Sequence, residues 1–141
     1  MSSRKEVKRD IIVNSAFELF LEKGYMNTKI IDIADAVGIG KGTFYEYFTS
    51  KEELLLEVLS VKVITDYSYV DAIINLDISC HDKLKAFLQF QKECISKYGS
   101  NAFALQQQLL GGDPALSHEV MKAIHAVSMH LYNCIYHIIC Q

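Results

Sequence analysis

The sequence is poor in proline, the residue that interrupts helices most strongly: one proline occurs in 141 residues. Tryptophan is absent, while 50% of the residues are hydrophobic. Near absence of proline favours long uninterrupted helices over a turn-rich β protein. No run of 18 apolar residues occurs, and the charged start MSSRKEVKRD precedes no apolar segment of the signal-peptide type. We therefore expect an all-α protein that is soluble and cytoplasmic.

The cysteines and the net charge carry no simple functional signal. The four cysteines include no CxxC pair, so free thiols are expected in a reducing cytoplasm. The formal net charge of -3 argues against binding of a polyanion through bulk charge. Binding to DNA would require basic residues gathered on one face. The N-terminal third offers Arg4, Lys5, Lys8, Arg9, Lys29, Lys41 and Lys51, with the first four forming either a flexible basic arm or nothing ordered.

Two helices are predicted before residue 40. Apolar residues at helical spacing, flanked by charged residues, predict a first helix over residues 5–23, and Gly24 is its expected end. Thr28 is the expected N-cap of a short second helix that stops at Gly38. The step from Ala34 to Gly38 suits a helix-turn-helix, because a small residue lets two helices cross closely and glycine permits a tight turn.

A third and a fourth helix are predicted directly afterwards. The third is expected from Lys41 to about Phe48, because capping residues follow. Ser50 and Glu53 form an S-x-x-E capping box, which predicts that a long fourth helix opens there and extends towards residue 74.

The remainder of the chain is also predicted to be helical. A fifth helix is expected over residues 82–97, a break at KYGSN, and a sixth helix over residues 102–110. GGDP marks another break, after which Asp113 and Pro114 are typical of the N-cap and first residue of a seventh helix. We therefore expect about seven helices in all.

The stretch GIGKGTFYEYFTSKEEL, residues 38–54, concentrates small residues and phosphate-binding groups around the short third helix. Phe44 and Phe48 are four residues apart and are expected to face the core, which leaves the polar side chains outside. Gly42 permits close approach near the helix start, where N–H groups and the helix dipole attract phosphate. Lys29 and Lys51 lie at two neighbouring helix starts. This arrangement is typical of a helix that enters the major groove of DNA.

These residues carry a resemblance to a known family. GIGKGTFYEYFTSKEEL, preceded by TKIIDIADAV and RDIIVNSAFELFLEKGY, closely resembles the DNA-binding domain of TetR-family transcriptional regulators over about residues 8–58. The resemblance implies a dimeric, ligand-responsive repressor that binds a palindromic operator in double-stranded DNA. Members often have serine or threonine at the position of Gly40, so a backbone N–H is expected to replace that contact. Carried over by position, the DNA-binding residues are Thr28, Lys29, Gly40, Lys41, Gly42, Thr43, Tyr45, Tyr47 and Lys51.

The resemblance also predicts what the later helices do. It divides the chain into a helix-turn-helix domain over residues 1–50 and a helical ligand-binding and dimerisation domain over residues 51–141. The alternative for each apolar residue there is ordinary core packing. No cofactor is expected, and the effector is expected to be a small lipophilic or aromatic molecule. The residues in the region that surrounds an effector in the family are Tyr67, Phe87, Phe90, Phe103 and Gln107.

The terminal helix offers the main alternative chemistry. His130, Cys134 and His137 lie at the spacing i, i+4, i+7, and a metal or redox sensor would use such groups. One straight helix usually presents only two close ligands, and no carboxylate or CxxC pair completes the set. We therefore interpret the stripe as packing or a subunit interface and predict no metal site. A Cys–His nucleophile lacks an orienting group, so we predict no enzyme.

The C-terminal end is expected to be short relative to the family. Members usually continue into two more helices that form the dimer, whereas IYHIICQ is an abruptly apolar end. A helix that is apolar on most sides from Val127 to Cys140 nevertheless predicts self-association, with a dimer as the product. Two functions stay open: a DNA-binding regulator, and a truncated interaction protein that pairs with itself or a longer relative without productive DNA binding.

Overall fold

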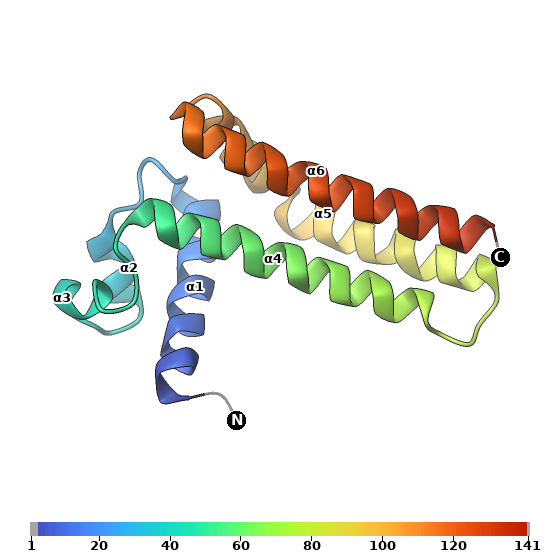
Figure 1. The fold of residues 1–141 in the computed structure, drawn as a ribbon, viewed down its shortest axis with the longest axis horizontal. Helices are drawn as coiled ribbons and strands as arrows, with labels where there is room; N and C mark the ends of the chain where they lie inside the picture. Colours follow the sequence, from blue (N-terminus) through green and yellow to red (C-terminus); the bar gives the residue numbers. More distant parts are fainter. Residues whose placement is uncertain (1–2, 141) are drawn as a thin grey trace.

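The computed structural model describes residues 3–140, and six α-helices account for most of them. No β-strand occurs among these residues. The all-α fold class predicted from the sequence is therefore confirmed. The helices are α1 (Arg4–Lys23), α2 (Ile30–Ala36), α3 (Lys41–Phe44), α4 (Lys51–Ile74), α5 (Cys80–Leu110) and α6 (Pro114–Ile139) (Figure 1).

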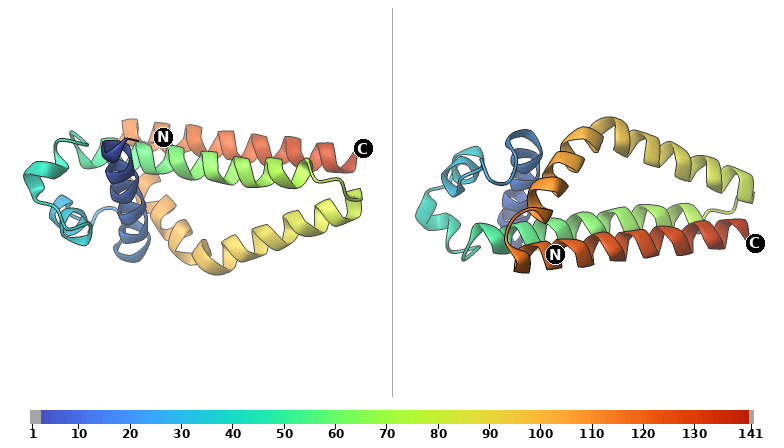
Figure 2. Two further views of the ribbon diagram at one scale, coloured as in Figure 1. Left: turned by 90° about the horizontal axis from the view of Figure 1, so that it is seen from below. Right: turned by 90° about the horizontal axis from the view of Figure 1, so that it is seen from above.

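Helices α1 to α3 form a small group at one end of the molecule, and three long helices extend from it (Figure 1). Helix α4 leaves the group and runs beside α6, while α5 runs back from the far end (Figure 2). The chain thus returns to the N-terminal group where α5 meets α6, and α6 then ends at the far end of the bundle. Helices α2 and α3 are left at the tip of the molecule.

Side-chain caps and glycine explain where the helices begin and end. The Ser3 hydroxyl accepts a hydrogen bond from the Glu6 N–H, and the Glu6 carboxylate accepts one from the Ser3 N–H. Helix α1 therefore opens with a reciprocal capping box. It ends at Gly24, whose φ of 83° lies in the left-handed region that favours glycine. Asp113 caps α6 and Pro114 occupies its first turn, which confirms the prediction for GGDP.

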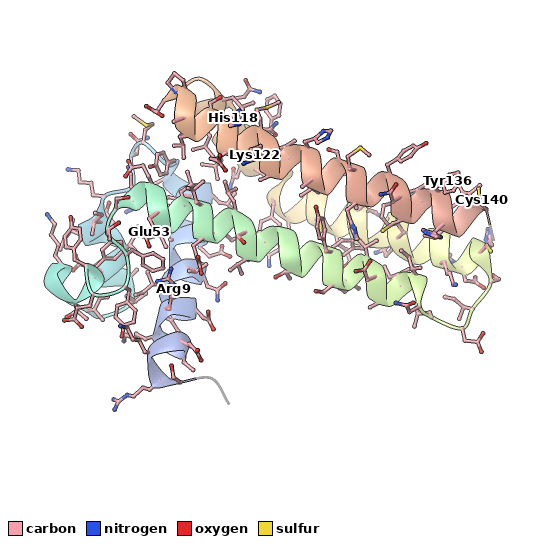
Figure 3. The ribbon with its side chains drawn as sticks, viewed as in Figure 1. Arg9, Glu53, His118, Lys122, Tyr136 and Cys140 are labelled. Carbon is pink, nitrogen blue, oxygen red and sulfur yellow. The ribbon has the colours of Figure 1, made fainter. Side chains whose placement is uncertain are left out.

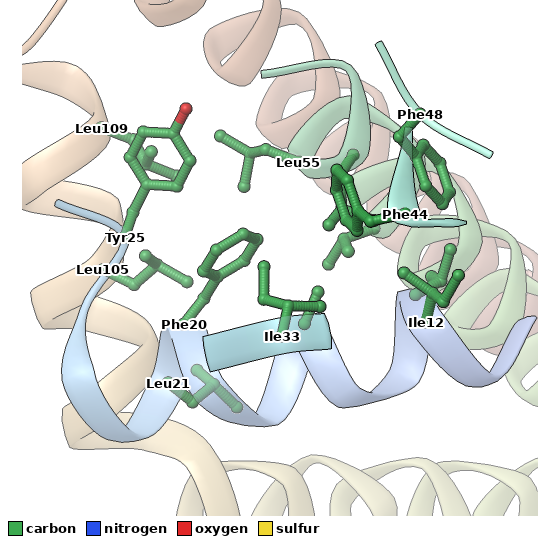
Figure 4. Close-up of a cluster of buried hydrophobic side chains, with 14 of the residues drawn as sticks. Ile12, Phe20, Leu21, Tyr25, Ile33, Phe44, Phe48, Leu55, Leu105 and Leu109 are labelled. Carbon is green, nitrogen blue, oxygen red and sulfur yellow. The ribbon is translucent and has the colours of Figure 1, made fainter. Parts of the chain in front are cut away.

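The main hydrophobic core lies between the N-terminal helices and the near ends of the long helices (Figure 4). Phe20, Phe44 and Phe48 are almost fully buried in it, and the ring centres of Phe44 and Phe48 lie 5.9 Å apart. Leu105 and Leu109 of α5 close the core from the side of the long helices. Burial of one such side chain contributes about 1.5 to 3 kcal/mol. This packing holds α3, which is too short to be stable alone.

A second and smaller cluster lies further along the three long helices. Each of these helices contributes to it, so the cluster joins α4, α5 and α6 to one another. Its buried residues are Val70, Phe87, Cys134 and Ile138.

Two boundaries predicted for the helix-turn-helix are wrong. Thr28 does not cap α2, because Lys29 is the N-cap residue and its N–H donates to the Asp32 carboxylate at 2.8 Å. The third helix is shorter than the predicted 41–48. Regular α-helix covers only Lys41–Phe44, and turn-type hydrogen bonds carry the chain on to Phe48.

The capping box predicted at the start of α4 is half formed. The Ser50 hydroxyl accepts a hydrogen bond from the Glu53 N–H at 3.1 Å, as predicted. The Glu53 carboxylate instead accepts hydrogen bonds from the N–H and the hydroxyl of Thr49. Thr49, the residue before the N-cap, therefore forms the reciprocal hydrogen bond in place of Ser50, and α4 still begins at Lys51.

The predicted break at KYGSN is a bend. The segments 82–97 and 102–110, expected as separate helices, belong to the continuous helix α5, which bends midway along its length (Figure 2). KYGSN lies near the middle of α5 and contains Gly99 followed by Ser100. Glycine and serine pairs are a common cause of such kinks, because they weaken a helix without ending it. Residues 3–140 thus form six helices where seven were expected.

Candidate nucleic-acid interface

The turn between α2 and α3 sets the geometry of the helix-turn-helix. Gly38 has a φ of 69°, a conformation that other residues rarely adopt, and it reverses the chain within a short turn. The Ile39 N–H donates to the Ala34 carbonyl at 3.0 Å and fixes the turn against α2. Ala34 is fully buried, as a small residue at a helix crossing should be. The predicted helix-turn-helix is therefore present.

Helix α3 buries one face and exposes the other. Phe44 is fully buried, whereas Lys41 and Gly42 are exposed and Thr43 is half-buried. Tyr45, directly after α3, keeps 46% of its surface exposed. A β-carbon added at Gly42 would meet no atom of the described residues within 4 Å. This face of α3 is thus open to close approach by another molecule.

Five of the predicted DNA-binding residues, Thr28 among them, line one surface hollow of about 530 Å³. Lys29, Lys41 and Lys51 reach it from the starts of α2, α3 and α4. Tyr45 lines the same hollow. Ammonium and hydroxyl donors from three helix starts therefore share one concave surface. Such donors suit the phosphate oxygens of a nucleic-acid backbone.

The two ends of α3 carry the predicted residues Gly40 and Tyr47. Gly40 is the exposed N-cap of α3, and no side chain caps the helix there. Tyr47 is half-buried and lines a second hollow of about 500 Å³. Its neighbours in that hollow are Arg4, Lys5, Lys8 and Glu46, and the basic residues among them belong to the start of α1. The basic residues are therefore helical and lie beside the turn that follows α3, so neither alternative stated for them, a flexible basic arm or nothing ordered, is correct.

Arg9 makes contacts within the fold. Its Nη1 donates to the Tyr47 carbonyl at 2.6 Å, and its Nε lies 3.4 Å from the Glu57 carboxylate. The guanidinium carbon lies 4.1 Å from the centre of the Phe48 ring. Figure 3 shows Arg9 on α1 where this helix meets the helix-turn-helix. Arg9 therefore ties α1 to the turn that follows α3.

Thr28 and Lys51 hold the loop between α1 and α2. Thr28 is fully buried, and its hydroxyl donates to the Gly24 carbonyl at 2.8 Å. The Lys51 ammonium donates to the carbonyls of Tyr25 and Thr28, each at 3.0 Å. The Thr28 hydroxyl thus points inward, which argues against its predicted contact with a phosphate. Lys51 has three N–H donors, so one remains for an acceptor outside the fold.

Acidic groups beside the larger hollow carry shifted pKa values. Hydrogen bonding by its own backbone lowers the pKa of Glu52, and hydrogen bonds from Tyr25 and Ser50 and the charge of Lys51 lower it further. The Tyr25 hydroxyl donates to Glu52 at 3.1 Å, and burial followed by the charge of Glu52 raises the pKa of Tyr25. Hydrogen bonds from Thr49 lower the pKa of Glu53. The hollow therefore combines lysines with the ionised carboxylate of Glu52.

The five residues predicted to surround an effector are not gathered in one place. Tyr67 is half-buried on α4 and stacks on a histidine ring of α6 at 3.9 Å. Phe87 is buried in the second cluster, and the Phe90 ring stacks on a tyrosine of α4 at 4.2 Å. Phe103 is 63% exposed, and Gln107 is exposed as well. Only the first three therefore pack between the long helices.

The polar residues of the terminal helix also separate into two groups. His137 is exposed, whereas His130 is partly buried and Cys134 is buried beside α4. Asp71 of α4 joins His130 and Cys134 there. Burial and the charge of Asp71 raise the pKa of the Cys134 thiol. Asp71 could not be recognised from the sequence, because no local spacing connects it with residues on another helix.

Residues 12–58 match the family model described as bacterial regulatory proteins of the tetR family. None of the helices among residues 3–140 has the length and apolar character needed to cross a membrane.

Two curated relatives illustrate how far the likeness extends. The uncharacterized HTH-type transcriptional regulator YuxN of Bacillus subtilis is 47% identical over 53 residues, which are 38% of this chain and 18% of that protein. The IcaR negative transcriptional regulator of the biofilm operon icaADBC of Staphylococcus epidermidis is 27% identical over 128 residues, or 89% of this chain and 65% of that protein. The matches to the first four curated relatives span 17 to 42% of those proteins' lengths.

A solved structure extends the likeness of the fold beyond the helix-turn-helix. The transcriptional regulator FadR from Bacillus subtilis, solved in complex with stearoyl-CoA, superposes with a TM-score of 0.70. The superposition covers 88% of this chain and 67% of that chain, with 21% sequence identity. At this identity the likeness establishes the fold alone.

Proposed function

Because residues 12–58 of the chain belong to the tetR family of bacterial regulatory proteins, we propose that the chain is a DNA-binding transcriptional regulator that acts as a repressor. The observation that carries the proposal is the open face of α3, beside which Lys29, Lys41 and Tyr45 line one hollow. The matched proteins are transcriptional regulators and not enzymes, in agreement with the prediction from the sequence.

In the proposed complex, α3 and the turn after it enter the major groove, which is wide enough for a helix. Gly42 and Thr43 approach the base edges, because no side chain at residue 42 stands between the backbone and the groove. Lys29, Lys41 and Tyr45 bind phosphates. The phosphate contacts are completed by the third ammonium hydrogen of Lys51, the Tyr47 hydroxyl and the backbone near Gly40.

We further propose a division of the chain at residues 50 and 51, with the second part taking the regulatory role in the cytoplasm. In this proposal a homodimer binds a palindromic operator, since a two-fold protein pair demands a two-fold site. The effector is a small lipophilic or aromatic molecule. Two observations support this class of effector. Phe87 and Phe90 pack between the long helices, and the FadR neighbour was solved in complex with stearoyl-CoA.

Selection of binding sequences from random double-stranded DNA tests the proposal directly. We expect the parent chain to enrich sequences with two symmetric half-sites. Gly42→Leu should abolish enrichment without changing the thermal midpoint, because the added side chain has open space in the fold and would occupy the groove. Gly42→Ala is the matched control and should bind more strongly than the leucine variant. Folded parent protein that enriches no sequence would favour the truncated interaction protein.

The salt dependence of binding separates phosphate contacts from other effects. Each phosphate contact contributes a slope of about −0.9 in log K against log salt. Lys41→Ala should therefore reduce the magnitude of the slope by about one, and should lower the affinity for all DNA sequences by a similar factor. Lys92→Ala removes the same charge from an exposed position on α5 and should leave the slope unchanged. Equal slopes for the two variants would remove Lys41 from the interface.

A further inference from the structure

Three potential metal ligands converge between α4 and α6. Asp71 comes from α4, and His130 and Cys134 come from one face of α6, four residues apart. Their ligand atoms, the Asp71 carboxylate oxygen, the His130 ring nitrogen and the Cys134 sulfur, all lie within 4.8 Å of one another. The His130 Nε2 lies 3.2 Å from the Asp71 Oδ1. No other group of three such ligands is found among the described residues.

We propose that Asp71, His130 and Cys134 form a binding site for a divalent metal ion of the zinc type. Thiolate, imidazole and carboxylate are the three ligand types that Zn²⁺ uses in proteins, at distances of about 2.0 to 2.3 Å. In a tetrahedron of that size, ligand atoms are separated by about 3.3 to 3.8 Å. The two ligand atoms that lie furthest apart therefore have to approach each other by about 1 Å. Rotation of the side chains allows a shift of this size. The fourth position falls to water.

The surroundings of His130 favour a ligand over plain packing. Its Nε2 is buried, yet the geometry towards Asp71 does not make a hydrogen bond, and no other described group supplies one. A buried polar atom without a hydrogen-bond partner costs free energy, and a metal ion would use its lone pair. The Tyr67 ring stacks on the imidazole at 3.9 Å and limits its rotation. The ligand atom is therefore held in place beside the other two.

The charges of the cluster also favour a cation. Cys134 is only 3% exposed, and the negative Asp71 lies beside its thiol. Burial and the negative charge of Asp71 both disfavour the deprotonated thiolate of Cys134 as long as no cation is near. A bound divalent ion would stabilise the thiolate and the carboxylate together. Metal binding would then join α4 to α6 through one bond from α4 and two bonds from α6. This proposal goes beyond DNA binding and does not depend on it.

Titration of the reduced full chain with Co²⁺ and Zn²⁺ tests the proposal. We expect one equivalent of Co²⁺ to give thiolate-to-cobalt charge-transfer absorption, Zn²⁺ to displace it, and Zn²⁺ to raise the thermal midpoint. Cys134→Ser should abolish the charge-transfer band. Asp71→Asn and His130→Gln should weaken binding at least about 10- to 100-fold, the loss that even an outer-shell partner causes. The exposed position of Asp71 makes Asp71→Asn the variant least able to disturb folding.

Two controls on the same helix separate the site from chelation at the surface. His137→Ala removes an exposed residue of α6 and Cys140→Ser changes the exposed C-cap residue that follows it, and both should leave metal affinity unchanged. A loss of binding in these controls, together with normal binding by Asp71→Asn, would overturn the proposal in favour of ligands on α6 alone. Absence of a charge-transfer band from the folded parent chain would also overturn it.

Discussion

The two ends of the molecule are packed differently. The N-terminal helices surround aromatic rings that are almost fully buried, among them Phe20, Phe44 and Phe48. The long helices share a smaller buried cluster and keep many large apolar side chains exposed. The N-terminal helices therefore share an aromatic core with the near ends of the long helices, whereas the far parts of the long helices present much apolar surface. The most exposed of these side chains are Leu88, Ile95, Phe103, Tyr132, Tyr136 and Ile139.

The largest effect should come from removing an aromatic ring from the N-terminal core. Phe44→Ala should lower the free energy of unfolding by about 3 to 5 kcal/mol, because it leaves a cavity among fully buried side chains. Phe103→Ala on α5 removes the same ring from a position that is 63% exposed and should change stability by less than about 0.5 kcal/mol. Urea denaturation measures both. Similar losses would break the contrast between the two ends.

A smaller loss should follow when the loop between α1 and α2 is released. Lys51→Met keeps the length of the side chain but removes its hydrogen bonds to the Tyr25 and Thr28 carbonyls. We expect the free energy of unfolding to fall by about 1.5 to 3 kcal/mol, the range for hydrogen bonds to charged groups. Lys92→Met, at an exposed position on α5, is the matched control. Equal thermal midpoints for these variants would show that Lys51 does not hold the loop.

The exposed apolar face of α6 should support self-association. We expect light scattering across a concentration series to show a dimer for the parent chain. Replacing Tyr132 and Tyr136 together by lysine should raise the dissociation constant at least about tenfold, or about 1.4 kcal/mol. The control is Leu88→Lys, which adds charge to an exposed position on α5. A parent chain that stays monomeric at high micromolar concentration would contradict the proposed dimer.

The smallest effect concerns acid stability at the start of α4. Hydrogen bonds from Thr49 lower the folded-state pKa of Glu53. The contribution of this carboxylate to folding stability is therefore complete above the unfolded pKa of about 4.3. The contribution is lost as the pH falls through the lower folded pKa. Glu53→Gln should therefore melt slightly below the parent at pH 7, and the difference should vanish in acid. A difference that persists unchanged in acid would rule out this carboxylate as its source.

Local signals in the sequence predicted most helix boundaries. The glycines at 24 and 38 adopt positive φ angles, and Ser50 and Asp113 cap their helices. These devices act over a few residues, so they can be recognised without knowledge of the rest of the fold. The exposed side of α3 was also predictable, because the burial of Phe44 and Phe48 follows from their spacing.

Features that depend on distant parts of the chain could not be predicted in this way. Thr28 looks like a helix cap, but the carbonyls of Leu19 and Gly24 accept from its hydroxyl. Lys51 looks like a surface lysine, but tertiary contacts place its ammonium against the loop before α2. Asp71 joins His130 only because α4 lies beside α6. In each case the contact is determined by tertiary packing and not by the spacing of residues along the sequence.

Each long helix contributes side chains to both buried clusters. On α5, Phe87 belongs to the smaller cluster and Leu105 to the larger one. Helices α4 and α6 do the same, with Leu55 and Val70 on one and Val120 and Ile138 on the other. Loss of one cluster would leave three helices frayed along half of their length. The two ends should therefore lose their order as one cooperative unit, in a single melting transition that circular dichroism and aromatic fluorescence report together.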